Sequence, residues 1–72
     1  MSPAQQTIEL DQFIKWQGLA PTGGQAKQMI QAGRVRVNGQ VETRRKRKLV
    51  SGDVVSIDSR SLTVHLEPAD PH

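Results

Sequence analysis

The chain has 72 residues, of which ten are Lys or Arg and seven are Asp or Glu, so its formal net charge is +3. At this length the chain forms one domain, and folding buries only about 60% of the surface that the unfolded chain exposes, which leaves a small core. Because the sequence contains no cysteine, a disulfide-stapled secreted fold and a thiolate zinc finger are both excluded.

The two ends of the chain carry no periodic apolar residues that could be buried. Residues 1–6 lack the basic start and apolar stretch of a secretory signal, and no segment approaches the roughly 18 apolar residues of a membrane span. We therefore expect a soluble cytoplasmic protein without membrane contact. Residues 7–66 should form a single domain, and residues 1–6 and 67–72 should be flexible tails.

A first amphipathic helix is predicted to end just before Gly18. Leu10, Phe13 and Ile14 recur at helical spacing and fall on one stripe, with Trp16 at its edge. Gly18 suits a left-handed helix exit, because glycine has no side chain that opposes this backbone conformation. We expect Phe13 in the core, and Trp16 as a surface packing residue rather than a platform for stacked bases.

A second helix is predicted to begin at Thr22. The Thr22 hydroxyl can accept the backbone N–H of Gln25, and the Gln25 side chain can reach back, which makes a capping box. Gly33 marks the exit from this helix. The predicted apolar face consists of Ala26, Met29 and Ile30.

The apolar pattern then changes to a period of two, which indicates a half-buried strand. Val35 and Val37 point to one side of this strand, while Arg34 and Arg36 point to the other. Asn38-Gly39 is a strong hairpin signal, because both residues tolerate a positive φ.

Further strands are predicted beyond the hairpin turn. Val41 resumes the strand pattern, whereas residues 44–48 contain no apolar side chain and form either a solvated strand or a loop. Ser51-Gly52-Asp53 and Asp58-Ser59 are predicted turns. Apolar residues alternate with polar ones around them, at Val55 and Ile57 and then at Leu62, Val64 and Leu66. This order predicts an α+β domain, with two short helices followed by a small, mainly antiparallel sheet of about four strands.

Most of the positive charge lies in one stretch of the chain. Residues 25–50 contain eight of the ten Lys and Arg residues and one acid, Glu42, so the stretch carries +7. The other residues contain two bases and six acids and carry −4. Clustered charge of this kind suits a polyanion, and guanidinium groups match phosphate oxygens, although residues 44–48 alone could also be a solvated loop without a specific partner. The helix and strand patterns place Lys27, Arg34 and Arg36 outside the core, so the basic groups should converge.

The start of the second helix is a candidate phosphate site. Its first turn exposes unpaired backbone N–H groups beside the cap Thr22, and Gly23 and Gly24 carry no side chain that would keep a phosphate away. The alternative is that the two glycines only make a flexible link between the helices.

No catalytic site and no metal site are expected. Asp11 belongs to a helix start and Asp53 to a turn, and no nucleophile, base and orienting group occur as a set. His65 and His72 lack a partner histidine or cysteine at ligand spacing. We therefore expect neither enzymatic activity nor a cofactor.

A succession of residues between Leu10 and Ile57 carries a family resemblance. Its most specific parts are residues 33–39 and the downstream Gly52-Asp53; the other matching residues are Leu10, Phe13-Ile14-Lys15, Gly18-Leu19, Ala26, Ile30, Lys48-Leu49 and Val55. Together they resemble the S4 domain, an RNA-binding module named after a ribosomal small-subunit protein. Within that family the chain is most similar to small stand-alone bacterial proteins of the YbcJ type, over residues 24–27 and 41–44.

The resemblance implies an L-shaped arrangement of helices and strands, the alpha-L motif, in which RNA is contacted by the second helix and by the basic loop beyond the Asn38-Gly39 turn. Helix contacts would come from Gln25, Lys27, Gln28 and Gln31. Phosphates would be contacted by Arg34, Arg36, Arg44, Arg45, Lys46, Arg47 and Lys48. Many family members begin the second helix with Ser-Arg, whereas this chain has Thr22-Gly23, so the cap is kept and the arginine contact is lost.

We therefore expect a monomeric, non-catalytic RNA-binding protein that contacts structured RNA, either ribosomal or transfer RNA, alone or in a ribosomal particle. About four to six phosphate contacts would give a slope of log affinity against log salt of about −3 to −5. The competing interpretation is a protein-interaction or ribosome-assembly module, whose basic face docks an acidic partner and whose last strand offers a sheet edge. DNA binding is a third alternative.

Overall fold

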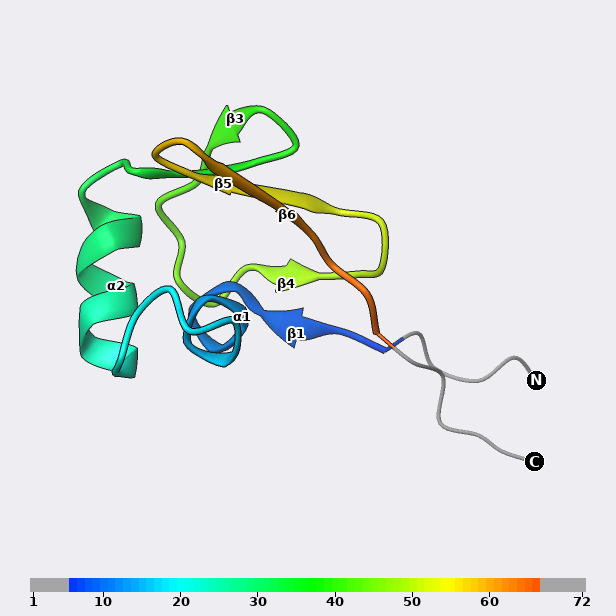
Figure 1. Cartoon of the computed structure of the whole chain (residues 1–72), viewed down its shortest axis with the longest axis horizontal. Helices are drawn as coiled ribbons and strands as arrows, with labels where there is room; N and C mark the ends of the chain where they lie inside the picture. Colours follow the sequence, from blue (N-terminus) through cyan, green and yellow to red (C-terminus); the bar gives the residue numbers. More distant parts are fainter. Residues whose placement is uncertain (1–5, 67–72) are drawn as a thin grey trace.

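The computed structural model describes residues 6–66, which form two helices and six short strands (Figure 1). In chain order these are β1 (Ile8–Glu9), α1 (Leu10–Trp16), α2 (Gly23–Gln31), β2 (Val35–Val37), β3 (Gln40–Val41), β4 (Lys48–Leu49), β5 (Val54–Ile57) and β6 (Arg60–Thr63). The predicted α+β class is confirmed. The tails predicted for residues 1–6 and 67–72 lie outside the described residues, apart from the exposed Gln6.

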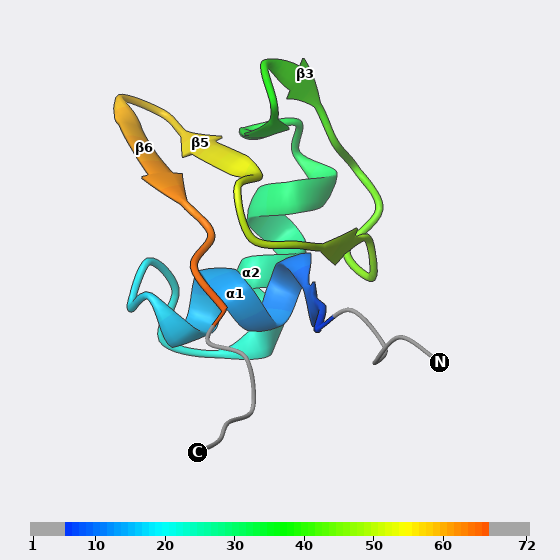
Figure 2. The same cartoon turned by 90° about the vertical axis from the view of Figure 1, so that its right-hand side faces the viewer.

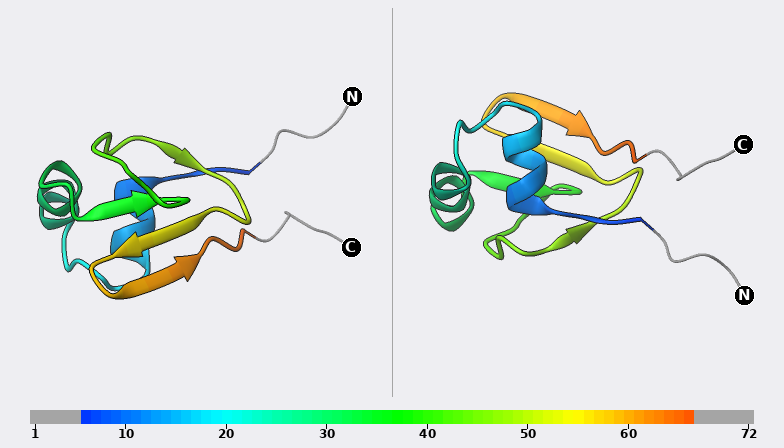
Figure 3. Two further views of the ribbon diagram at one scale, coloured as in Figure 1. Left: turned by 90° about the horizontal axis from the view of Figure 1, so that it is seen from above. Right: turned by 90° about the horizontal axis from the view of Figure 1, so that it is seen from below.

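The strands form two antiparallel sheets. The larger sheet has the order β3-β2-β5-β6, and the smaller one pairs β1 with β4. Helix α1 lies beneath the inner face of the larger sheet, and α2 stands at one end of it (Figures 1 and 3). The segment between β3 and β4 and the β5–β6 hairpin lie on opposite sides of the molecule (Figure 2).

The core fills the space between the helices and the inner face of the larger sheet. Its members are at most 4% exposed and comprise Leu10, Phe13, Ile14, Ala20, Ala26, Ile30, Val35, Val37, Leu49, Val55, Ile57 and Val64. Met29, Leu62 and Leu66 were expected inside and lie partly buried at its edge. Trp16 is 60% exposed and meets Phe13 edge-on, which confirms the prediction of a surface packing residue.

Two local features differ from the sequence-based expectation, and a third decides between the alternatives left open for residues 44–48. The patterns do not predict β1, because two residues are too few to show a period of two, and the β1–β4 sheet is therefore additional to the expected one. Residues 44–47 form a loop with a turn at 45–46, while Lys48 begins β4. The last strand ends at Thr63 instead of Leu66, because the chain beyond bonds to a neighbouring turn: the Leu66 N–H donates to Ser51 Oγ at 2.8 Å.

The helix boundaries follow the predicted signals. Thr22 Oγ1 accepts the Gln25 N–H at 3.1 Å, although the reciprocal bond from the Gln25 side chain is not among the hydrogen bonds within residues 6–66. Gly18 and Gly33 have φ of +76° and +79°, as left-handed exits require. Neither helix within the described residues is long and apolar enough to cross a membrane.

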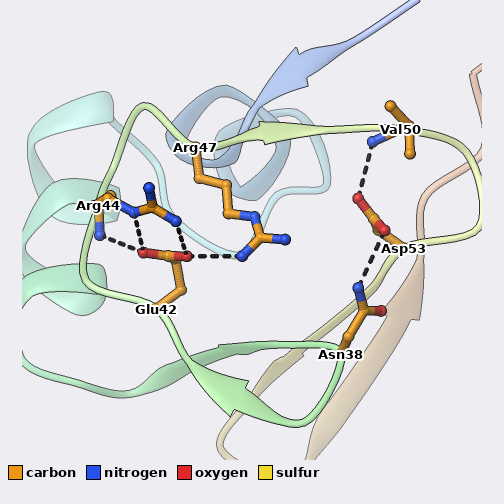
Figure 4. Close-up of polar contacts among 6 residues, drawn as sticks. All are labelled: Asn38, Glu42, Arg44, Arg47, Val50 and Asp53. Carbon is orange, nitrogen blue, oxygen red and sulfur yellow. Dashed lines mark hydrogen bonds and ion pairs between the residues drawn. The ribbon is translucent and has the colours of Figure 1, made fainter.

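Side chains tie the hairpin turn at Asn38 to the turn that precedes β5 (Figure 4). Asn38 has a φ of +53°, its Nδ2 donates to Asp53 Oδ1 at 3.1 Å, and its Oδ1 accepts the Val54 N–H at 2.9 Å. Asp53 Oδ2 accepts the Val50 N–H at 3.0 Å. The two turns that the sequence predicts separately are therefore one hydrogen-bonded unit.

Replacement of Asn38 by Ala should lower the free energy of unfolding by about 2 kcal/mol, because it removes two side-chain hydrogen bonds and leaves a poorly suited residue at positive φ. Urea denaturation followed by circular dichroism measures the change. Asn38→Gly is the matched control: it loses the same bonds but tolerates the backbone conformation, so its deficit should be smaller. Wild-type stability of Asn38→Ala would contradict the proposed role of this network.

Candidate nucleic-acid interface

Residues 42–48 form the basic segment, which links β3 to β4 and passes over the first turn of α1. The carbonyl oxygens of Arg47 and Arg45 accept the N–H groups of Leu10 at 2.8 Å and Asp11 at 3.0 Å. Helix α1 has no side-chain cap at Glu9. The basic segment thus satisfies N–H groups that a helix start leaves unpaired, and this ties its backbone to a helix of the core.

Glu42 holds two arginines of the basic segment in place (Figure 4). Its Oε2 accepts the backbone N–H and the Nε of Arg44, both at 3.0 Å, and its Oε1 accepts Arg44 Nη2 at 3.1 Å and Arg47 Nη1 at 2.9 Å. Glu42 is only 7% exposed. The hydrogen bonds from the side chains of Arg44 and Arg47 outweigh the effect of burial and lower the pKa of Glu42 to about 2.

Lys46 is paired with carboxylates at the start of α1. Its Nζ lies 3.2 Å from Glu9 Oε1 and 3.9 Å from Asp11 Oδ2. Asp11 is 8% exposed, and its other oxygen, Oδ1, has no hydrogen-bond partner within residues 6–66. This pairing orients Lys46 toward the β1–α1 junction.

Arg34 is paired across the larger sheet with Asp58. Its Nη2 donates to Asp58 Oδ2 at 2.6 Å, and its Nε donates to Oδ1 at 3.3 Å. The hydrogen bond from Arg34 lowers the pKa of the Asp58 carboxyl, and the same bond raises the pKa of Arg34. Both side chains are about half exposed, so water screens the pair.

The remaining predicted cations have no carboxylate within 4.0 Å among residues 6–66; they are Lys27, Arg36, Arg45 and Lys48. Lys27 belongs to α2, Arg36 to β2, Arg45 to the turn of the basic segment and Lys48 to β4. The eight predicted basic contacts, seven phosphate contacts and Lys27, therefore divide equally into paired and unpaired side chains. The unpaired ones can meet a phosphate without breaking an ion pair within the described part of the chain.

The predicted helix contacts divide between two flanks of α2. Gln25 and Gln28 line a shallow hollow of about 330 Å³ together with Arg34, which faces the β5–β6 turn. Lys27 lies about 160° around the helix from Gln25, since each residue advances by about 100°. Gln31 follows one turn after Lys27. The structure thus places Gln25 and Gln28 on the side of Arg34, and Lys27 on another flank of α2.

The start of α2 is open to solvent. Thr22, Gly23 and Gly24 are exposed, and the N–H groups of the two glycines have no partner in the described part of the chain. A Cβ built at Gly23 would meet nothing within 4 Å, and one at Gly24 would meet only Thr22 Oγ1 at 3.8 Å. Packing within residues 6–66 therefore does not require glycine at either position.

Sequence reasoning missed the carboxylates that hold the basic side chains. Glu42 offered a signal, because it is the only acid in residues 25–50 and precedes Arg44 by two positions. Asp58 offered none, because it lies 24 residues from Arg34 and meets it only through the pairing of β2 with β5.

The Glu42→Gln variant should lose about 1–3 kcal/mol of the free energy of unfolding at pH 7, because charged hydrogen bonds become neutral ones. The wild-type contribution is fully present above pH 4.5, the ordinary pKa of the carboxyl, and is lost as the pH falls toward 2. Urea denaturation of both proteins from pH 7 to pH 2 should therefore show the deficit shrinking over that interval.

Glu9→Gln is the matched control, because it removes a carboxylate that pairs with only one lysine, and its deficit should be smaller. A deficit of Glu42→Gln that is equally large at both ends of the pH range would contradict the assignment.

Comparisons with known proteins identify the family of this chain. A family model described as the S4 domain matches residues 1–65. "Putative RNA-binding protein YbcJ" from Escherichia coli (strain K12) is 42% identical over 57 residues, which cover 79% of this chain and 81% of that protein. "Probable ribosome maturation protein RlbA" from Bacillus subtilis (strain 168) is 43% identical over 51 residues, which cover 71% and 72% of the two chains.

A solved structure shares the fold. The 30S ribosomal protein S4e from Thermoplasma acidophilum matches with a TM-score of 0.71 at 24% identity. The match covers 85% of this chain and 32% of S4e, so this chain spans about a third of that structure. The family match, the two curated relatives and the shared fold confirm the resemblance carried by residues 33–39 and Gly52-Asp53: this chain belongs to the S4 domain family.

Proposed function

We propose that this protein is a non-catalytic RNA-binding protein that grips the phosphates of structured RNA, either ribosomal or transfer RNA. The observation that carries the proposal is the basic segment, whose backbone is held by Glu42 and the first turn of α1. Arg45 and Lys48 stay free of carboxylates within residues 6–66. A cluster of cations that is already ordered binds a polyanion without the entropic cost of ordering its loop.

The names of two relatives support RNA as the partner. YbcJ is named as an RNA-binding protein and RlbA as a ribosome maturation protein, and both match more than two thirds of this chain. We infer that RNA is the ligand of this chain as well, and that ribosomal RNA in a maturing particle is the favoured setting.

The contacts would run from the basic segment along α2. Arg45, Lys48 and Lys27 contact phosphates directly, and Arg44, whose side chain is 74% exposed, can turn its outer N–H groups to RNA while it holds Glu42. At the far end of α2, the free N–H groups of Gly23 and Gly24 suit one further phosphate. Such contacts read shape and backbone more than base sequence.

The double variant Arg45→Gln/Lys48→Gln should weaken RNA binding on the order of tenfold at ~0.1 M salt and make the salt slope shallower by about 1.5, because two phosphate contacts are lost. For the wild type, about four free cations predict a slope of about −3. Titrations of bulk transfer RNA and of a folded ribosomal RNA fragment at several salt concentrations measure both quantities, with matched duplex DNA as competitor.

Lys15→Gln is the charge-matched control, because Lys15 is an exposed base on α1 outside residues 25–50. It should leave affinity and slope unchanged. An affinity of the wild type that does not depend on salt would contradict the proposal.

The competing assembly function is tested in cells. Crosslinking followed by sequencing should recover RNA attached to this protein. Recovery of protein partners alone, in complexes that resist nuclease, would instead identify a module that docks an acidic protein.

A further inference from the structure

We propose that the outer face of the larger sheet is a second RNA-binding surface, which takes a sugar–phosphate segment of the RNA. The inference deepens the proposed function, on which it rests, by adding a face away from the basic segment. Helix α1 covers the inner face of the sheet, whereas no element of residues 6–66 covers the outer face (Figures 1 and 2).

One row of residues crosses this outer face from β3 to β6. Arg36 lies directly opposite Val41 on one side and Ser56 on the other, and Ser56 lies opposite Ser61. Cross-strand partners point to the same face, and neighbouring strands lie about 4.8 Å apart. The row therefore places the Arg36 side chain beside two serine hydroxyls on adjacent strands.

These side chains line a shallow hollow of about 520 Å³, which also includes Ser59. The hydroxyl oxygens of Ser56 and Ser61 lie 2.9 Å apart, and either can donate to the other. One bond uses one hydroxyl proton, so the second proton stays available to an oxygen of a ligand.

The charge of the face suits an anion. Arg36 has no carboxylate within 4.0 Å in the described part of the chain. Arg34, two positions earlier, also lines the hollow, but its charge is balanced by Asp58 at 2.6 Å. One free guanidinium and one balanced guanidinium thus border the same hollow, and both match phosphate oxygens in geometry.

The RNA backbone fits this face better than RNA bases do. Within residues 6–66 the aromatic side chains of Phe and Trp both belong to α1, so the outer face offers no Phe or Trp ring on which bases could stack. Hydroxyl groups that donate and accept match the ribose 2′-OH, and a guanidinium matches phosphate. A sugar–phosphate segment presents both groups side by side.

The hollow continues onto α2. Arg34 lines both the hollow on the sheet and the one beside Gln25 and Gln28. An RNA backbone that passes over the sheet can therefore continue along the flank of α2 that carries Gln25 and Gln28.

Two variants test the surface, and they are expected to change RNA affinity in opposite directions. Arg36→Gln should weaken RNA binding several-fold and make the salt slope shallower by about 1. Asp58→Asn should strengthen binding and make the slope steeper by about 1, because Arg34 loses the carboxylate that balances its charge. Both replacements suit the fold, since Arg36 is exposed and Asn tolerates the φ of +55° at position 58. Titration of a folded RNA at several salt concentrations measures both.

Arg60→Gln is the matched control. Arg60 lies opposite Ile57, whose side chain is buried on the inner face. The Arg60→Gln substitution therefore removes the same charge from the same sheet, but from the other face. The variant should bind RNA as the wild type does. Equal behaviour of Arg36→Gln and Arg60→Gln would overturn the inference.

The outcomes separate this inference from the proposed function. If Arg45→Gln/Lys48→Gln weakens RNA binding while the Arg36 and Asp58 variants match the wild type, the second surface is wrong and the proposed function stands. If the wild type binds no RNA, both are wrong.

The hydroxyl contacts have a test of their own. Ser61→Ala should reduce the preference for single-stranded RNA over DNA of the same sequence, because DNA lacks the 2′-OH. An unchanged ratio would overturn the ribose contact. Competition by polyglutamate that depends on Arg36 and not on Arg45 would instead assign the face to an acidic protein.

Discussion

The carboxylate of Glu42 holds together the side of the molecule that carries most of the positive charge. It is nearly buried, and it stays ionised because Arg44 and Arg47 donate four hydrogen bonds to it. Without this anion the guanidinium groups of Arg44 and Arg47 would repel each other within the basic segment. Glu42, the single acid of residues 25–50, therefore allows Arg44 and Arg47 to lie close together in one ordered segment.

The basic segment is also part of the fold and not an appendage to it. Its carbonyl groups complete the first turn of α1, and Leu49, which follows it, is buried in the core. In a domain with a small core and no disulfide, this coupling lets one stretch of chain contribute to stability and also carry the proposed binding site. A change in the backbone of the segment would break its hydrogen bonds to the N–H groups of Leu10 and Asp11 and so disturb the packing of α1.

Helix α2 stands between two surfaces of different character. The basic segment presents charge held by an acid, whereas the outer face of the larger sheet presents one free arginine among hydroxyls. The family resemblance implies a Ser-Arg pair at the start of this helix, and this chain has Gly23 in place of the arginine. The helix start therefore offers free backbone N–H groups instead of an arginine side chain. A phosphate bound at the start of α2 would be held by backbone N–H groups, whereas the other proposed RNA contacts come from side chains.

The sequence by itself determined the two helices, the cap of α2 at Thr22, the helix exits at Gly18 and Gly33, the hairpin at Asn38 and the buried faces of β2 and β5. These features depend on neighbours within a few residues, so local periodicity and backbone preference are sufficient to predict them. The sequence also placed the charge in residues 25–50. Only the tertiary structure decided that Arg34, Arg44, Lys46 and Arg47 are paired, that β1 joins β4, and that Lys27 and Gln25 face different ways. The ion pairs of Arg34 and Lys46 and the strand pairs join residues that are far apart in the chain, and their geometry follows from strand register and helix packing, which no local pattern encodes. Glu42 lies only two and five positions from Arg44 and Arg47, but the path of the loop between them decides that they meet.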